Sequence, residues 1–169
     1  ASGSNNGTSW INAYTDLQSA LAAAASGDEV WMAAGTYKPT AGADRTISFD
    51  PPAGVKIYGG FAGTETSRSQ RDWITNKTIL TGDLSGNDNA NIARTEATRS
   101  DNTYNLVEII SKATEVVMDG LVIQGGNANS GMHQENGSGG ALFMRTSTVT
   151  LRNCTVEKNT AYKGGAIYD

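Results

Sequence analysis

The polar and apolar residues at the start of the chain follow a helical period. Over 17–24, apolar residues recur at intervals of three and four, which places them on one face of a helix. Thr15 and Gln18 fit a capping box at its start, because each side chain can bond the other residue's backbone N–H. Gly27 suits the end of a helix. This pattern predicts one short amphipathic helix over about 15–25.

Beyond the helix the period changes to two, which is typical of strands. The alternating runs, each bounded by Gly, Asn, Asp or Pro, are 29–33, 55–58, 78–81 and 105–110. The segment 82–102 is long, rich in Asn and Asp and weakly apolar, so we expect a loop excursion there. No second helical pattern follows, which argues against βαβ units.

The last third of the chain contains an internal repeat. Residues 116–128 align without gaps onto 149–161 at an offset of 33, with the shared pattern V-x-[ML]-x-x-[LC]-x-[IV]. The motif at 139–143 recurs at 164–168, an offset of 25. Repeats of this length are typical of solenoids, in which each unit buries its apolar face on its neighbours.

The spacing inside the repeat indicates the kind of solenoid. Val116 and Met118 alternate, two polar or small residues intervene, and alternation resumes at Leu121 and Ile123. Because side chains alternate across a strand, two short strands joined by a tight bend would point all four side chains inward. This predicts an all-β protein with the architecture of a right-handed parallel β-helix.

We expect a single domain, in which 1–27 form an N-terminal cap and 28–169 form the coils. Leu17 and Leu21 of the helix would cover the open end of the core, which would otherwise present an unpaired edge. At the other end the chain stops inside a repeat. We therefore expect 1–169 to be the N-terminal portion of a longer chain, or a subunit whose open end another chain covers.

Three single residues have predicted places in this architecture. Cys154 aligns with the inward Leu121, so it is expected to be a buried small hydrophobe rather than a nucleophile. Asn159 is expected to turn inward and bond backbone groups of the neighbouring coil. His133 falls in a loop rich in Gly and Asn and is expected to be exposed. One cysteine and one histidine exclude a disulfide framework and a metal centre built from several histidines.

A series of motifs, in this order, resembles a known family. The motifs lie at 7–10, 16–25, 27–37, 55–66, 70–73, 76–83 and 139–141. They resemble secreted bacterial right-handed parallel β-helix repeat surface proteins of the Bacteroidota type, which have a pectate-lyase-like fold. The Gly-Gly-Ala repeats are similar to those of chlamydial polymorphic outer-membrane proteins. The resemblance implies a secreted protein on a bacterial cell surface.

Composition narrows the possible partners. The net charge is −4 and no basic run occurs, so nucleic-acid binding is not expected. The longest apolar stretch, 20–25, is far shorter than the roughly 20 residues of a membrane-spanning helix. We expect the partner to be a surface glycan or another protein chain.

Polysaccharide cleavage is the main catalytic alternative, because pectate-lyase-like folds host lyases. That chemistry uses carboxylates, often with Ca²⁺, and a basic residue. The candidates are Asp83, Asp88, Asp101, Asp119, Lys112, Arg145 and Arg152. They are scattered along the sequence, so no residue is assigned as catalytic.

Trp73, Asp83 and Asp88 are the candidate ligand-binding residues. Trp73 follows an Arg-Asp pair and is the best candidate for an exposed ring that stacks on a sugar. Asp88 lies in 87–91, where oxygen-bearing side chains alternate as in a calcium loop. The glycine and glutamate of an EF-hand are missing, so only a looser Ca²⁺ site stays open.

These observations predict a noncatalytic cell-surface module, either adhesin-like or part of a structural stalk. The alternatives are a carbohydrate-active enzyme of the lyase or glycosidase type and a carbohydrate-binding module.

Overall fold

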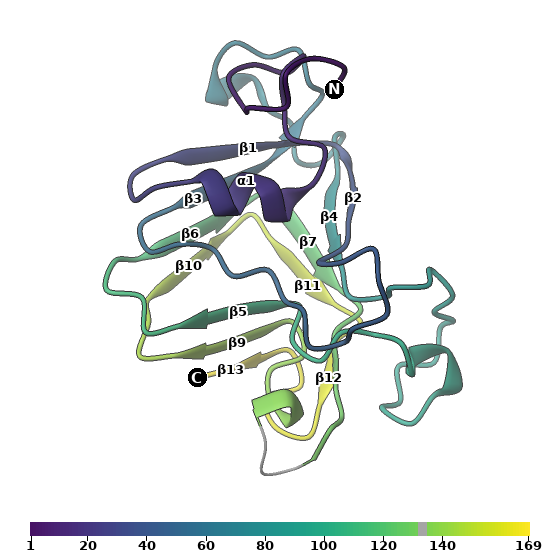
Figure 1. The fold of residues 1–169 in the computed structure, drawn as a ribbon. Helices are drawn as coiled ribbons and strands as arrows, with labels where there is room; N and C mark the ends of the chain where they lie inside the picture. The colour runs from purple at the N-terminus through teal and green to yellow at the C-terminus, as the bar shows by residue number, and fades with distance from the viewer. Residues whose placement is uncertain (132–134) are drawn as a thin grey trace.

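A computed structural model describes residues 1–131 and 135–169 (Figure 1). This described part is mostly strand in parallel sheets, with one α-helix, α1 (Leu17–Ala23). The strands are β1 (Glu29–Ala33), β2 (Gly35–Tyr37), β3 (Lys56–Phe61), β4 (Thr78–Thr81), β5 (Val107–Ile110), β6 (Val116–Asp119), β7 (Leu121–Gln124), β8 (Asn127–Ala128), β9 (Leu142–Arg145), β10 (Val149–Arg152), β11 (Thr155–Glu157), β12 (Thr160–Ala161) and β13 (Ile167–Tyr168). Short 3₁₀ turns occur at η1 (Arg68–Gln70), η2 (Ala97–Arg99) and η3 (Glu135–Gly137). No helix among the described residues has the length and apolarity to cross a membrane.

Among the described residues, the strands pair only in parallel, in four sheets. Their orders are β1-β3-β6-β10, β11-β7-β4-β2, β12-β8 and β13-β9-β5. The chain visits these sheets in the same order on successive passes: β6, β7, β8 and β9 are followed by β10, β11, β12 and β13, each beside its counterpart (Figure 1). Strands from successive passes therefore stack on one another.

The internal repeat predicted from the sequence is confirmed as a pairing register. Val149 pairs with Val116, at the predicted offset of 33. Ile167 pairs with Leu142, at the predicted offset of 25. The repeat thus records which residues lie side by side on neighbouring strands.

One hydrophobic core is shared by the three larger sheets and the helix. The four predicted inward side chains, Val116, Met118, Leu121 and Ile123, are each at most 1% exposed. Leu17 and Leu21 of α1 belong to the same buried cluster and are each 3% exposed. The helix therefore packs its apolar face on the core, as the sequence predicts.

The predicted start of the helix is wrong in detail. The N-cap is Asp16, whose carboxylate accepts a hydrogen bond of 2.8 Å from the backbone N–H of Ser19. The Gln18 amide donates instead to the carbonyls of Pro39 and Ser48, at 2.9 Å each. No capping box with Thr15 forms, because these two carbonyls of the neighbouring segment occupy the Gln18 side chain. The helix is also two residues shorter at each end than 15–25.

The corners between strands depend on left-handed backbone. Gly120, between β6 and β7, has a φ of 77°, and Asn153, between β10 and β11, has a φ of 50°. Gly125 after β7 and Lys158 after β11 repeat this arrangement at 82° and 53°. A non-glycine residue in this region carries a cost of about 1–2 kcal/mol, so the corners constrain the sequence.

Candidate ligand-binding groove

A hollow of about 400 Å³ lies on the outer face of the sheet β11-β7-β4-β2. We call it the outer groove. Its floor and rim come from outward positions on or beside three adjacent strands, namely Lys77, Ile79, Val122, Gln124, Thr155 and Glu157, and one side is formed by Trp73 and Ile74. Ile79 pairs with Val122 and Val122 with Thr155, so the floor is a row of aligned side chains. The remaining lining residues are Gly120, Leu121, Asn153 and Cys154.

Trp73 is placed at the groove by close contact with two glycines. A Cβ on Gly60, whose φ is 95°, would lie 2.7 Å from the backbone nitrogen of Trp73. A Cβ on Gly120 would lie 3.0 Å from the Cβ of Trp73. The tryptophan therefore packs directly on the backbone of β3 and on the β6–β7 corner, with its side chain 36% exposed.

A buried arginine fixes the tryptophan ring. The Arg71 guanidinium carbon lies 4.8 Å from the ring centroid of Trp73 and 5.1 Å from that of Tyr58. Arg71 also forms an ion pair of 2.8 Å with Asp119, and their side chains are only 8% and 9% exposed. Asn153 donates to the same carboxylate at 2.8 Å. This network links the Trp73 segment to β3, β6 and the β10–β11 corner.

The turn after Trp73 is held by Asp72. Its carboxylate accepts hydrogen bonds from the backbone N–H groups of Ile74 and Thr75, at 3.0 Å each, and one from the Thr75 hydroxyl. The backbone and side-chain hydrogen bonds from Thr75 and the bond from Ile74 hold the pKa of Asp72 below its usual value. The side of the groove is therefore a rigid turn.

Several polar side chains of the groove are not used by the fold. Lys77, Gln124 and Thr155 make no side-chain hydrogen bond within the described part of the chain. Cys154 differs: its thiol donates to the carbonyls of Met118 and Arg152, and burial raises its pKa. The cysteine is therefore half-buried, not buried as the sequence predicts, whereas the lysine, glutamine and threonine can bond a ligand.

A second hollow, of about 140 Å³, lies at the ends of the same strands. We call it the loop hollow. It is lined by Thr81, Asp83, Asp88, Asn89, Gln124, Gly125 and Lys158. Gln124 lines both hollows. The structure therefore brings Asp83 and Asp88 together in the loop hollow, and places Trp73 in the neighbouring groove.

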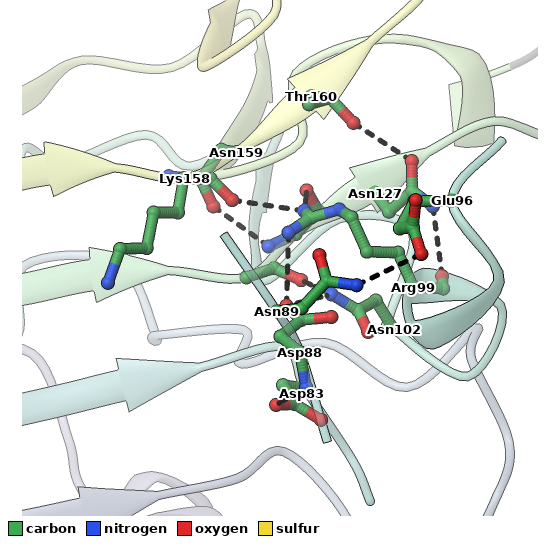
Figure 2. A network of polar contacts seen from close by, with 12 residues as sticks. Asp83, Asp88, Asn89, Glu96, Arg99, Asn102, Asn127, Lys158, Asn159 and Thr160 are labelled. Carbon is green, nitrogen blue, oxygen red and sulfur yellow. Dashed lines mark hydrogen bonds and ion pairs between the residues drawn. The ribbon is translucent and has the colours of Figure 1, made fainter. Parts of the chain in front are cut away.

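Both aspartates are engaged in organising the loop (Figure 2). Asp83 accepts hydrogen bonds from the backbone N–H groups of Gly86, Asn87 and Asp88, at 2.6, 3.1 and 3.0 Å. Asp88 accepts from Arg99 at 3.0 Å and from Asn102 at 2.8 Å. These contacts connect residues within the excursion 82–102, which the sequence predicts as a loop.

Arg99 fastens this loop to the strands behind it. Its side chain is 1% exposed and donates to the carbonyls of Gly126 and Lys158, at 3.0 Å each. Burial raises the pKa of Asp88, while its contacts with Asn102 and Arg99 act in the opposite direction. The Asp88–Arg99 pair is therefore a structural contact with restricted access to solvent.

Several side-chain oxygen atoms of 87–91 accept hydrogen bonds within the fold. The Asp88 carboxylate holds Arg99, the Asn89 oxygen accepts from the Asn91 N–H at 2.7 Å, and the Asn91 oxygen accepts from the Ala93 N–H at 3.0 Å. Within the described residues, no group of three or more His, Cys, Asp or Glu side chains is placed to hold a metal ion. The alternating oxygens of the sequence stabilise turns here.

The other candidates for lyase chemistry lie in separate contacts. Asp119 pairs with Arg71, Lys112 with Asp50 at 2.8 Å, and Arg145 with Glu135. Asp101 accepts a hydrogen bond from the backbone of Ser85 in the loop. His133 lies outside the described residues.

Sequence reasoning did not select Gln124, Lys77, Thr155 or Glu157. In the sequence, the one feature that marks these four residues is their outward position in the alternating strand pattern. In the folded chain they also lie close to Trp73. Such positions are polar in most half-exposed strands, so the signal becomes specific only when Trp73 is placed beside them.

Comparisons of the chain with protein-family models, with curated proteins and with solved structures return no match.

Proposed function

We propose that the chain is a right-handed parallel β-helix module of an adhesin-like surface protein, and that its outer groove binds a glycan without cleaving it. The exclusively parallel pairing and the repeated order in which the chain visits the sheets support the β-helix. The right-handed sense follows the strong preference of parallel crossover connections. A bacterial and secreted origin rests on the motif resemblance.

The observation that carries the binding proposal is the composition of the outer groove. A pyranose ring has an apolar C–H face and a rim of hydroxyls, so it is recognised by an aromatic ring together with hydrogen-bonding side chains. Trp73 supplies a fixed and partly exposed ring. Lys77, Gln124 and Thr155 supply donors and acceptors that no internal bond occupies among the described residues.

Binding without cleavage is favoured by how the carboxylates are used. Asp88 and Asp119 are each bound to a buried arginine, and Asp83 accepts three backbone N–H groups. A carboxylate that serves as a catalytic acid or base must instead reach the substrate. Glu157 is the one acidic residue in the lining of the outer groove.

A glycan array followed by calorimetric titration of the best ligand tests the proposal. We expect Trp73→Ala to weaken binding roughly tenfold, which corresponds to about 1.4 kcal/mol of lost stacking. The matched control is Tyr162→Ala, because Tyr162 is 40% exposed, carries an arginine stacked 3.9 Å from its ring centroid and lies outside both hollows. The affinity of the Tyr162→Ala variant for the glycan should equal that of the unmodified protein.

Two results contradict the proposal. Release of shortened or unsaturated products from a polysaccharide, with or without added Ca²⁺, would establish the enzyme alternative. Equal affinity of the Trp73→Ala variant and the unmodified protein would remove the groove as the binding site.

A further inference from the structure

We infer that the outer groove and the loop hollow are two parts of one elongated site, which binds an extended, uncharged oligosaccharide with Gln124 at the junction. This inference rests on the proposed glycan binding and names the length and charge of the ligand.

The two hollows follow each other along the same strands. The outer groove covers the start of β4 and runs along β7 and β11 to their last residues, and the loop hollow lies at the ends of the three strands. Thr81 pairs with Gln124, and Gln124 with Glu157, so one row of paired residues marks the boundary. From Lys77 to Thr81 an extended chain covers about 13 Å, at roughly 3.3 Å per residue, and the lining continues past the end of β4 to Asp83. This length accommodates several sugar units, not one.

The chemistry of the lining changes along this path. The groove end has apolar surface from Trp73, Ile79 and Val122, which suits a stacked sugar ring. The loop end has the Lys158 ammonium, which is charged and exposed. A sugar hydroxyl both donates and accepts, so it can accept a hydrogen bond from this ammonium. The two ends therefore fit different sugar units of one chain.

Lys158 and Gln124 have side chains available for this role. Figure 2 shows the Lys158 side chain directed away from Arg99, and it is 60% exposed. Its nearest acidic partner is Glu157, whose carboxylate lies 3.9 Å from the ammonium. The Gln124 amide has no internal hydrogen bond in the part of the chain that the structure describes.

The charges along the path favour an uncharged ligand. Lys77 and Lys158 are balanced by Glu157 and Asp83, while Asp88 is neutralised by its pair with Arg99. A polyuronic acid would bring a carboxylate to every sugar unit, and this balanced lining has no excess positive charge to compensate the loss of carboxylate hydration. Neutral chains should therefore bind better.

Affinity as a function of ligand length tests the inference. The probes are neutral β-linked oligomers of glucose, mannose and xylose, from dimers to hexamers, with oligogalacturonates as the charged series. We expect affinity for the neutral series that binds to rise at least tenfold from dimer to pentamer. In Lys158→Ala this rise should disappear while dimer affinity is kept, and Gln124→Ala should weaken the longer oligomers most.

A matched control and a second measurement keep the result interpretable. Lys163→Ala removes a lysine from outside both hollows and should keep the full dependence on length. In a backbone-assigned NMR spectrum of the unmodified protein, the pentamer but not the dimer should shift the amide signals of Asp83 and Gly125.

The outcomes separate this inference from the proposed function. Binding that depends on Trp73 but not on ligand length would overturn the elongated site and leave glycan binding intact. Tighter binding of oligogalacturonates than of every neutral series would overturn the uncharged class. Absence of binding to any glycan would overturn both proposals.

Discussion

Thr146 shows how the corners of this fold constrain single residues. Ser111 and Thr146 occupy equivalent corners after β5 and β9, with φ values of 54° and 53°. Threonine is poorly suited to left-handed backbone, because its branched Cβ crowds the main chain. Asn153, at another corner, shows the residue type that tolerates this conformation best after glycine.

Thr146→Asn should therefore stabilise the protein by about 0.5–1 kcal/mol, because asparagine relieves the left-handed strain without the chain entropy that glycine adds to the unfolded state. Thr146 is exposed, so no core contact is lost. Urea unfolding measures the change.

Thr148→Asn is the matched control for this substitution. Thr148 is also exposed but does not have a positive φ. The same chemical change there should leave stability unchanged or slightly lower. Equal effects at the two positions would show that the backbone conformation is not the cause.

At the scale of single residues, the sequence correctly predicts the side chain that bonds backbone groups of the neighbouring strand. Asn159 was predicted to turn inward, and its amide oxygen accepts from the Gly126 N–H at 2.8 Å while its nitrogen donates to the Ile123 carbonyl at 2.8 Å. The contact between Arg71 and Asp119 was not predicted. These two residues are far apart in sequence, and only the folded chain brings the charges together.

Among the elements, α1 packs on the hydrophobic core through few residues. Leu17 and Leu21 are its two buried side chains, and Ala20 and Ala24 pack beside them. A seven-residue helix is too short to be stable alone, so its place depends on this packing.

Leu21→Asp should cost more than about 3 kcal/mol, because it removes a buried side chain and places a carboxylate against the core. The matched control is Ala22→Asp on the exposed side of the same helix, where the cost should stay below about 1 kcal/mol. Thermal and urea unfolding of the pair measure the difference. A Leu21→Asp melting temperature equal to that of the control would show that the helix does not close the core.

Element boundaries were predictable where turn residues flank an alternating run. The runs 29–33 and 78–81 match β1 and β4. The run 55–58 was predicted too short, since β3 continues to Phe61 through two glycines. A Cβ on Gly59 would lie 2.5 Å from the Gly120 carbonyl oxygen. Glycine is needed there for close approach within a strand, not for a turn, and a single sequence does not distinguish the two roles.

On the scale of the whole molecule, segments distant in sequence meet around Glu108 on β5. Asp50, Lys112, Glu135 and Arg145 all act on its carboxyl group. Burial raises its pKa above the ordinary value, the charges of Glu135 and Asp50 raise it further, and Arg145 and Lys112 oppose them. The repeat in the sequence does not include β5, so it predicted neither the pairing of β5 with β9 nor the charges that gather beside Glu108.

The folded chain thus binds a proton at Glu108 more tightly than the unfolded chain does. This contribution to stability is fully present below the ordinary glutamate pKa of 4.5, and it is lost as the pH rises through the higher pKa of the folded state. Glu108→Gln keeps the shape of the side chain and removes the titration. The variant should be more stable than the unmodified protein at neutral pH, with the difference narrowing as the pH falls toward 4.5.

Urea unfolding across this pH range measures the stability of both proteins. Asp44→Asn is a control, because the Asp44 carboxyl is exposed and hydrogen bonds from Thr46 lower its pKa. The control should show no trend over this range, because the stability linked to the lowered pKa of Asp44 is lost only below its ordinary value of 3.8. A Glu108→Gln difference that stays constant over the range would mean that the surrounding charges cancel the burial of the carboxylate.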